Sequence, residues 1–251
     1  MRILALLCLS IGLPLMVAAG SAVQAADLTQ KDPACSHIAT VQYLDCEVAV
    51  LYSCPGPKLL ATPLIREEAF NPDGFNHFEV DTANGGMLVT GDAAGSYVIR
   101  TDAPTLKETT MAEVMAKGRG TFTANGSLKM FGVEKPAAQK IAIKATGVTG
   151  VLNGIPTIEF MADVSIDLPQ PMGPTVSTAK AYLVPSLGVY LAGEATAGTF
   201  FKAEDTPHRP MSLALPGQPG FDLTKPSFCG GSFSLLFRKL PPFAFLNGVP
   251  A

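Results

Sequence analysis

The sequence predicts an all-β, mainly antiparallel fold: a lipocalin-like barrel or a β-sandwich with one short helix and long Pro-rich loops. Three observations favour it. Apolar and polar residues alternate strictly in "TIEFMADVSIDL", residues 157–168, as in a half-buried strand. Asn-Gly pairs, which are strong turn signals, separate several short apolar runs. The 24 Gly and 21 Pro divide the rest of the chain into short pieces, as in an antiparallel barrel or sandwich.

The clearest element is a predicted hairpin over residues 139–168. "QKIAIKATGV" alternates like the run that follows it, and Asn153-Gly154 stands between the two. The same punctuation predicts turns at Asn84-Gly85, between "FNHFEVDT" and "MLVTGD", and at Asn125-Gly126, between "GTFT" and "SLKMF". "LGVYLAGEATAGTFF" and "SFSLLFRKL" indicate later strands.

One short helix and two long loops complete the expected fold. In "TTMAEVMAKG", Thr110 can cap a helix, Glu113 completes a capping box and Gly118 ends it. Residues 165–185 are rich in Pro, Ser and Gly, which predicts a long loop. Residues 202–226 predict a second loop and a candidate flap.

The N-terminus predicts export. Residues 1–25 form a signal peptide, with Arg2 as the positive region, an apolar stretch, and "VQA" before a cleavage after Ala25. An uncleaved anchor is the alternative, because the apolar run nearly reaches the length of a membrane span. Residues 26–251 then form a single β-rich domain with a Cys-rich N-terminal segment, 26–60. The expected location is the periplasm or the exterior.

Charge excludes several partners. Removal of residues 1–25 takes away Arg2 and no acid, so the formal charge moves from -3 to -4. A mildly acidic chain without a basic stripe does not predict binding to nucleic acid or to anionic membranes. No second apolar stretch is long enough for a transmembrane helix in the mature chain. The expected partners are a small apolar ligand or an envelope protein.

Four cysteines remain after cleavage: Cys35, Cys46, Cys54 and Cys229. An even number in an oxidising compartment predicts disulfides, and three pairings are open. We favour Cys35–Cys46 and Cys54–Cys229, which would close a short N-terminal loop and tie the start of the domain to its last strand. A metal site of Cys35 with His37 is the alternative, although no C-x-x-C pair supports it.

The sequence shows no catalytic motif, predicts no cofactor and offers no metal-ligand cluster. His77, in "GFNHFEV", reads as a structural residue on a strand. Glu159, Asp163 and Asp167 share one strand face, but successive members are about 13 Å apart, which fits a solvated face better than a metal site or a glycosidase pair. Met111 and Met115 have the spacing of a packed helix face.

One stretch resembles a known family. "GSLKMFGVEKP", residues 126–136, is similar to the signature turn of the YceI-like family, with these matching residues: Gly126, Leu128, Met130, Gly132, Val133, Lys135 and Pro136. Gly132 permits a tight turn, and Pro136 fixes φ as the next strand begins. The resemblance covers about residues 119–168. It implies an extended lipocalin-like antiparallel barrel, a periplasmic location and a long isoprenoid-type lipid in the interior.

Three classes of function follow. The first is an exported binding module that holds a lipid-like ligand in an apolar interior. The alternative is a structural or accessory envelope protein that acts through protein–protein contacts. An enzyme is the third, and it requires His77 or His208 within hydrogen-bond reach of a carboxylate in a cleft. An outer-membrane barrel fits the alternating strands, but not the Pro-rich loops or the small number of clear strands.

Overall fold

A computed structural model describes residues 28–56, 63–168, 173–198 and 208–227. In these ranges the chain forms thirteen strands, one 3₁₀ turn and one α-helix. In chain order they are β1 Ser36–Tyr43, β2 Val48–Cys54, β3 Leu64–Asn71, β4 Gly74–Thr82, β5 Met87–Asp92, β6 Tyr97–Thr101, η1 Ala103–Thr105, β7 Lys107–Glu108, α1 Met111–Lys117, β8 Arg119–Met130, β9 Val133–Leu152, β10 Ile155–Asp167, β11 Thr175–Val184, β12 Val189–Gly198 and β13 Pro210–Ala214.

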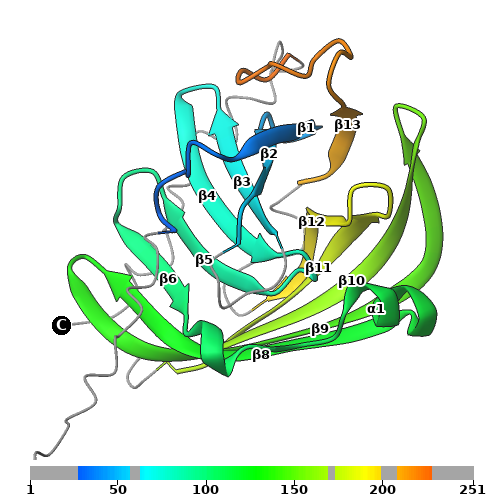
Figure 1. Ribbon diagram of the computed structural model, residues 1–251. Helices are drawn as coiled ribbons and strands as arrows, with labels where there is room; N and C mark the ends of the chain where they lie inside the picture. The colour runs from blue at the N-terminus through cyan, green and yellow to red at the C-terminus, as the bar shows by residue number, and fades with distance from the viewer. Residues whose placement is uncertain (1–27, 57–62, 169–172, 199–207, 228–251) are drawn as a thin grey trace, which may run out of the picture.

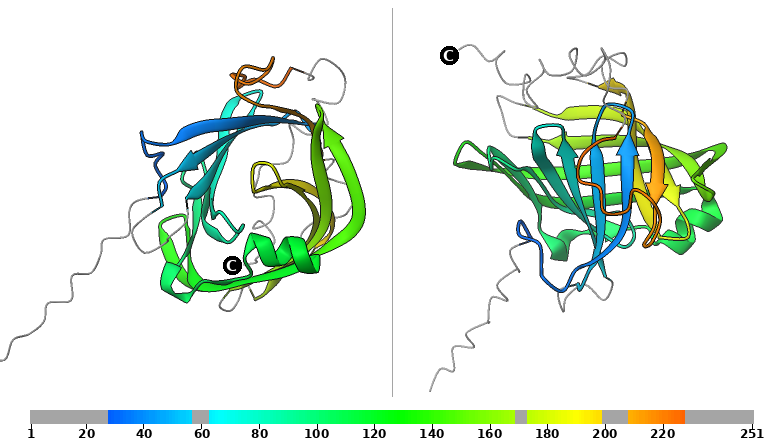
Figure 2. Two further views of the ribbon diagram at one scale, coloured as in Figure 1. Left: turned by 45° about the vertical axis from the view of Figure 1, so that its right-hand side comes forward. Right: turned by 90° about the horizontal axis from the view of Figure 1, so that it is seen from above.

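The strands form one antiparallel sheet that curls into a nearly closed barrel, which confirms the predicted fold class. The sheet order is β12-β11-β10-β9-β8-β6-β5-β4-β3-β2-β1-β13, with the short β7 paired to β8. Almost every strand therefore lies beside its neighbour in the sequence. Figure 1 shows the long strands β8–β10 opposite β1–β5, and the left view of Figure 2 shows the strands arranged as a ring.

Side chains complete the closure between the two edges of the sheet. β13 pairs with β1, with Leu213 opposite Val41, and it approaches β12. One apolar cluster then joins β1 and β2 to the strands on the other side of the gap, and its buried members are Ala39, Val41, Tyr43, Ala49, Leu51, Ile155, Val184, Val189, Leu191 and Leu213. Because β1 and β2 are far from β11 and β12 along the sheet, this cluster seals the seam between the two edges of the sheet. On β11 and β12 it uses the face opposite to Leu183 and Tyr190, which belong to a different cluster.

The predicted hairpin is present and extends further than expected. β9 and β10 meet at Asn153-Gly154, where φ is 49° and 84°, and Ile143 pairs with Ala162. Their inward face packs against Phe122 of β8 in a second cluster, while Lys144 and Asp163 are exposed. The period-two pattern thus separates the interior from solvent in this part of the wall.

The predicted turn at Asn125-Gly126 is wrong, because β8 runs without interruption through both residues. The local cause is a close approach of two strands. A Cβ on Gly126 would lie 1.9 Å from the carbonyl oxygen of Arg100 in β6, so only glycine fits. The true turn of the 126–136 stretch lies at Phe131-Gly132, with φ of 48° and 82°, between β8 and β9.

Helix α1 forms as its capping signals predict. The Thr110 hydroxyl accepts a hydrogen bond from the Glu113 backbone, and the Glu113 carboxylate accepts one from the Thr110 backbone. Gly118 ends the helix in the left-handed region, at φ 63°. Val114 is fully buried against Phe122, so the helix covers one part of the wall. Met111 packs beside them, but Met115 is 45% exposed, so the expected shared packing face is only half correct.

Both predicted long loops are shorter than expected. Residues 165–185 contain the end of β10 and all of β11, which pair from Ile158–Leu183 to Ile166–Thr175. The candidate flap, 202–226, contains β13 within its described part. Alternation with small residues in "TVSTAKAYLV" is a weak strand signal, and the flanking prolines obscure it.

The predicted disulfide pairing is wrong. Cys35 bonds to Cys54, which joins the entry of β1 to the end of β2. The reason is the hairpin register: Ser36 pairs with Ser53, so the next residues outward on each strand are the two cysteines. Cys46, in the β1–β2 turn, is also disulfide-bonded, and its partner lies outside the described residues. Cys229 and the run "SFSLLFRKL" also lie outside them, as does the predicted signal peptide.

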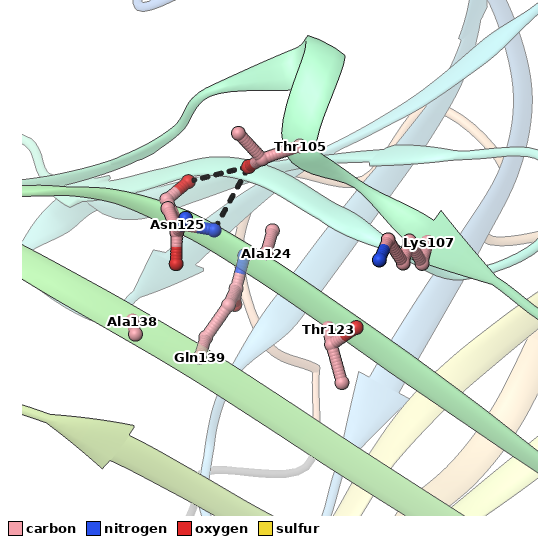
Figure 3. A pocket seen from close by; sticks show the side chains of 7 residues that line it. All are labelled: Thr105, Lys107, Thr123, Ala124, Asn125, Ala138 and Gln139. Carbon is pink, nitrogen blue, oxygen red and sulfur yellow. Dashed lines mark hydrogen bonds between the residues drawn. The ribbon is translucent and has the colours of Figure 1, made fainter.

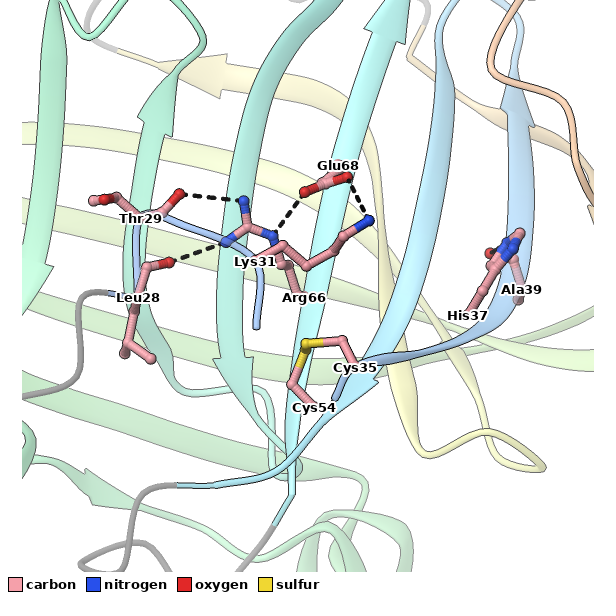
Figure 4. Close-up of polar contacts among 9 residues, drawn as sticks. All are labelled: Leu28, Thr29, Lys31, Cys35, His37, Ala39, Cys54, Arg66 and Glu68. Atoms are coloured by element: carbon pink, nitrogen blue, oxygen red, sulfur yellow. Dashed lines mark hydrogen bonds and ion pairs between the residues drawn. A yellow bond between two sulfur atoms is a disulfide. The ribbon is translucent and has the colours of Figure 1, made fainter. Parts of the chain in front are cut away.

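The segment before β1 crosses the outer face of β3 and β4 (Figure 4). The buried Arg66 donates hydrogen bonds to the carbonyl oxygens of Leu28, at 3.0 Å, and Thr29, at 3.3 Å, and pairs with Glu68 at 2.9 Å. The disulfide lies beside these contacts. Within the described part of the chain, no helix has the length and apolar character that a membrane crossing needs.

Candidate functional site

The inner face of β3 and β4 is acidic. Opposite residues of paired strands point to the same face, and Glu67 of β3 lies opposite both Leu51 of β2 and Glu79 of β4. Arg66, next to Glu67 on β3, points to the outer face under the segment before β1, so the alternation along the strand turns these carboxylates inward. Asp81 lies opposite Ile65, which packs on the apolar cluster at the seam. We call Glu47, Glu67, Glu79 and Asp81 the acidic stripe.

The residues that alternate with these acidic ones along β3 and β4 point to the outer face. Arg66, Phe78 and Val80 point outward and are buried under the segment that precedes β1. Both faces of β3 and β4 are thus covered, and the outer one carries Leu64, Phe78 and Val80 beside the Arg66–Glu68 ion pair. The alternation is therefore the reverse of that in β8–β10, where the inner face is the apolar one.

The stripe begins at the β1–β2 turn. The carboxylate of Glu47 lies 3.9 Å from Nδ1 of His77 and is only 13% exposed. The ligand atoms of Glu47, Glu67 and His77 all lie within 4.8 Å of one another. Three segments of the chain contribute one side chain each, so the group depends on the barrel and not on any local motif.

A second histidine, His208, lies at the end of the acidic stripe near Glu47. Nδ1 of His208 lies 2.9 Å from Oδ2 of Asp45, and its ring stacks on Tyr43 with the ring centres 4.0 Å apart. Burial alone would lower the pKa of His208, but the hydrogen bond to Asp45 and the charges of Asp45, Glu47 and Glu67 raise it. His208 therefore favours its positively charged form.

Burial and mutual repulsion disfavour ionisation of the stripe. Burial, followed by the charges of Glu79 and Glu47, raises the pKa of Glu67 to about 8. Burial also raises the pKa of Glu79, and burial with the charges of Glu79 and Glu67 raises that of Asp81. Among the described residues, no lysine or arginine pairs with these three carboxylates. A bound cation would oppose these shifts and favour the ionised carboxylates.

Several polar atoms at the stripe have no hydrogen-bond partner among the described residues. They are buried, and they are the Tyr43 hydroxyl, Asp45 Oδ1, Glu47 Oε1 and Asp81 Oδ1. Tyr43 is 1% exposed, and burial, followed by the charges of Glu67 and Glu47, raises the pKa of its phenol. Because an unpaired buried polar atom costs about 1–3 kcal/mol, such a concentration is typical of a binding site.

The opposite wall of the interior is mostly apolar. Ile141 and Val164 form a cross-strand pair on the inner face and are half-buried. Gln139 pairs with Ile166 on the same face, and its Oε1 also lacks a partner. Near the β4–β5 turn, Glu108 accepts hydrogen bonds from Thr82 at 2.5 Å and Asn84 at 2.7 Å, which satisfies that carboxylate.

Two hollows lie away from the stripe. One, of about 450 Å³, lies where η1 and β7 meet β8 and β9 (Figure 3). Its walls carry Thr105 and Asn125, which bond to each other, and Lys107. The other, of about 560 Å³, lies beside the Cys35–Cys54 bond and Arg66. Neither brings a base together with a nucleophile.

The histidines do not behave as the sequence predicts. His77 lies beside Glu47 and Glu67, although the sequence predicts only a structural role for it on a strand. His37 stacks on Phe221 with the ring centres 3.7 Å apart, and Cys35 is in a disulfide, which excludes the Cys35/His37 metal site. The Asp45–His208 pair meets the distance that an enzyme requires, but no serine, threonine or cysteine of the described ranges bonds to His208.

The fold and the interior define a class: a nearly closed antiparallel β-barrel with one acidic and one apolar inner wall. No protein-family model, curated protein or solved structure matches the chain. The interior geometry therefore carries the functional conclusion.

Proposed function

We propose that this chain is an exported binding protein that holds a small amphiphilic ligand inside its barrel. The observation that carries the proposal is the acidic stripe, opposite an apolar wall in the same interior. A ligand with a hydrocarbon body and a positively charged group matches both walls. Glu79 and Asp81 would face the charged group, while Ile141 and Val164 would contact the apolar body.

The acidic stripe adds a positively charged group to the lipid-like ligand that the sequence predicts. A long isoprenoid, as the YceI-like resemblance implies, would match the apolar wall and leave the stripe without a partner. Binding sites usually combine an apolar lining with a few polar groups that fix orientation. An amine on the ligand would play that part here.

Export is supported by the Cys35–Cys54 disulfide, because such bonds persist in oxidising compartments. The predicted cleavage after Ala25 is tested by the intact mass of the protein from its own host. A mature chain that begins at Ala26 supports export, and a chain that begins at Met1 in the membrane fraction supports the uncleaved anchor.

Native mass spectrometry of the protein purified from its host tests ligand binding. We expect a co-purified amphiphile that carries an amine, and we expect it to be lost from a Glu79→Gln/Asp81→Asn variant. An Asp163→Asn variant is the matched control, because Asp163 lies on the exposed outer face and bonds only to Thr178 among the described residues. Repeated absence of any adduct from the wild type would contradict the proposal.

A surface role as an envelope accessory protein is the second candidate. The observation that favours it is the tip of the β8–β9 hairpin, where Phe131 is 71% exposed and Val133 is 56% exposed. Exposed apolar residues on a projecting hairpin suit a protein contact. Cross-linking in envelope extracts, compared between the wild type and Phe131→Ser, separates this role from ligand binding. A cross-linked partner that Phe131→Ser abolishes would support it, and identical profiles would contradict it.

A further inference from the structure

The outer end of the acidic stripe has the donor set of a metal site. Glu47, Glu67 and His77 offer two carboxylates and one imidazole, with all ligand atoms within 4.8 Å of one another. Bound to one ion at the usual distances of 2.0–2.2 Å, such atoms lie about 3.4 Å apart. The side chains therefore need only a small approach, which rotation about their own bonds provides.

The backbone holds the three residues in place. Glu47 lies in the β1–β2 hairpin, where its carbonyl oxygen accepts a hydrogen bond of 2.8 Å from the backbone of Tyr43. Ala69 pairs with both Ala49 and His77, so the three strands are in register at this level. Glu67 lies two residues before Ala69 on the same face. A site built on paired strands is already organised before an ion arrives.

The second observation concerns Tyr43, a residue that is not one of the three proposed ligands. Tyr43 is almost wholly buried, its hydroxyl has no hydrogen-bond partner, and Glu67 and Glu47 are its strongest acidic neighbours. Oε1 of Glu47 is buried without a partner as well. A metal ion with a bound water would give both atoms a partner. The phenol would then bond to a ligand carboxylate or to that water, as groups around metal sites usually do.

We propose that Glu47, Glu67 and His77 bind a divalent transition-metal ion, with Tyr43 as the residue that orients the ligands. One imidazole and two carboxylates suit Zn²⁺ or Mn²⁺, whereas Ca²⁺ and Mg²⁺ prefer oxygen ligands alone. Three protein ligands leave a coordination position for water or for a donor atom of a further molecule. The site does not depend on the amphiphile, because it uses the end of the stripe away from Asp81.

Isothermal titration of chelator-treated, full-length mature protein with Zn²⁺ alone tests the proposal. We expect one equivalent to bind, and Mg²⁺ to bind at least about 100-fold more weakly. Glu67→Gln and His77→Gln should each weaken Zn²⁺ binding by about 10- to 100-fold or more, while the matched control Glu134→Gln, on an exposed hairpin, should bind like the wild type.

A spectroscopic measurement guards against variants that fail to fold. Co²⁺ in the wild type should give visible absorption bands, and Tyr43→Phe should shift them while circular dichroism shows an unchanged fold. No Zn²⁺ binding by the wild type, or binding that survives both Glu67→Gln and His77→Gln, would overturn the site. If the wild type binds no metal but still carries the amine-bearing adduct, this inference fails and the proposed function stands.

Discussion

In both walls of the barrel, side chains alternate between the inner and the outer face, but the two walls place opposite kinds of residue inside. Along β8–β10 the inner face is apolar, and charged residues such as Lys144 and Asp163 point to solvent. Along β3 and β4 the inner face carries Glu67, Glu79 and Asp81, while the segment before β1 covers an outer face of apolar residues and the Arg66–Glu68 ion pair. The first wall stabilises the fold, and the second retains polar groups that lower its stability. Retained destabilising groups are characteristic of functional sites.

The largest effect should come from the apolar wall. Phe160 is 1% exposed and packs against Val114, Phe122 and Tyr190. Phe160→Ala removes that packing and leaves a cavity, so we expect a loss of about 3–5 kcal/mol in the free energy of unfolding. Urea denaturation followed by circular dichroism measures it. A loss below about 1 kcal/mol would show that this wall is not the packed side of the barrel.

The next effect concerns the disulfide outside the acidic wall. Cys35 and Cys54 are 19 residues apart, and the chain-entropy model gives about 3 kcal/mol for a loop of that size. The double variant Cys35→Ser/Cys54→Ser should therefore melt roughly 6–12 °C lower. Peptide mapping without reduction checks the bond itself. A Cys35–Cys46 peptide would contradict the structure.

A substitution in the acidic wall should raise the free energy of unfolding instead of lowering it. Glu67→Gln removes a carboxyl whose ionisation burial opposes, so at pH 8 we expect the apo protein to gain about 1–2 kcal/mol. The matched control Glu134→Gln, on the exposed β8–β9 hairpin, should change stability by less than about 0.5 kcal/mol. Equal unfolding curves for Glu67→Gln and the wild type at pH 8 would refute the stripe as a destabilising feature.

The pH dependence follows from the same pKa shifts. The folded pKa of Glu67, about 8, lies above its unfolded value of 4.5, so the folded state binds more protons between these values and stability falls as pH rises through this range. The raised pKa of His208 acts in the same direction, because its contribution is present below pH 6.5 and is lost as pH rises. Thermal melts from pH 5 to 8.5 should therefore decline, and the decline should be smaller for Glu67→Gln. A flat profile would contradict both shifts.

The smallest effect belongs to the helix beside the apolar wall. Thr110→Ala removes a side-chain cap and should cost about 1 kcal/mol. Thr110→Ser keeps the hydroxyl and serves as the control. If both variants melt alike, the cap contributes nothing and α1 is held by Val114 alone.

Local signals in the sequence predicted much of the fold. The Asn153-Gly154 turn and the α1 capping box are formed by residues close together in the chain, so their chemistry is visible in the sequence. The turn predicted at Asn125-Gly126 is wrong, because the glycine that suits a turn also permits Arg100 to approach a continuous strand. The sequence could not show this, since β6 and β8 are separated by η1, β7 and α1.

The candidate site was missed for a related reason. Glu47, in the β1–β2 turn, meets Glu67 of β3 and His77 of β4 only through the register of the sheet, and nothing in their spacing marks them. The missed signal was in "LIREEAFN" and "GFNHFEVDT", where an acidic and an apolar set alternate but the sequence alone does not say which set faces inward.

Charge selection by the barrel interior tests the account's central claim most directly. Binding of decylamine, decanol and decanoate, measured by titration calorimetry at pH 7.5, compares ligands with the same apolar body. If the acidic wall faces a ligand, the amine should bind at least about 10-fold more tightly than the carboxylate, and Glu79→Gln/Asp81→Asn should remove the preference. Equal binding of the three, or a preference for decanoate, would contradict it.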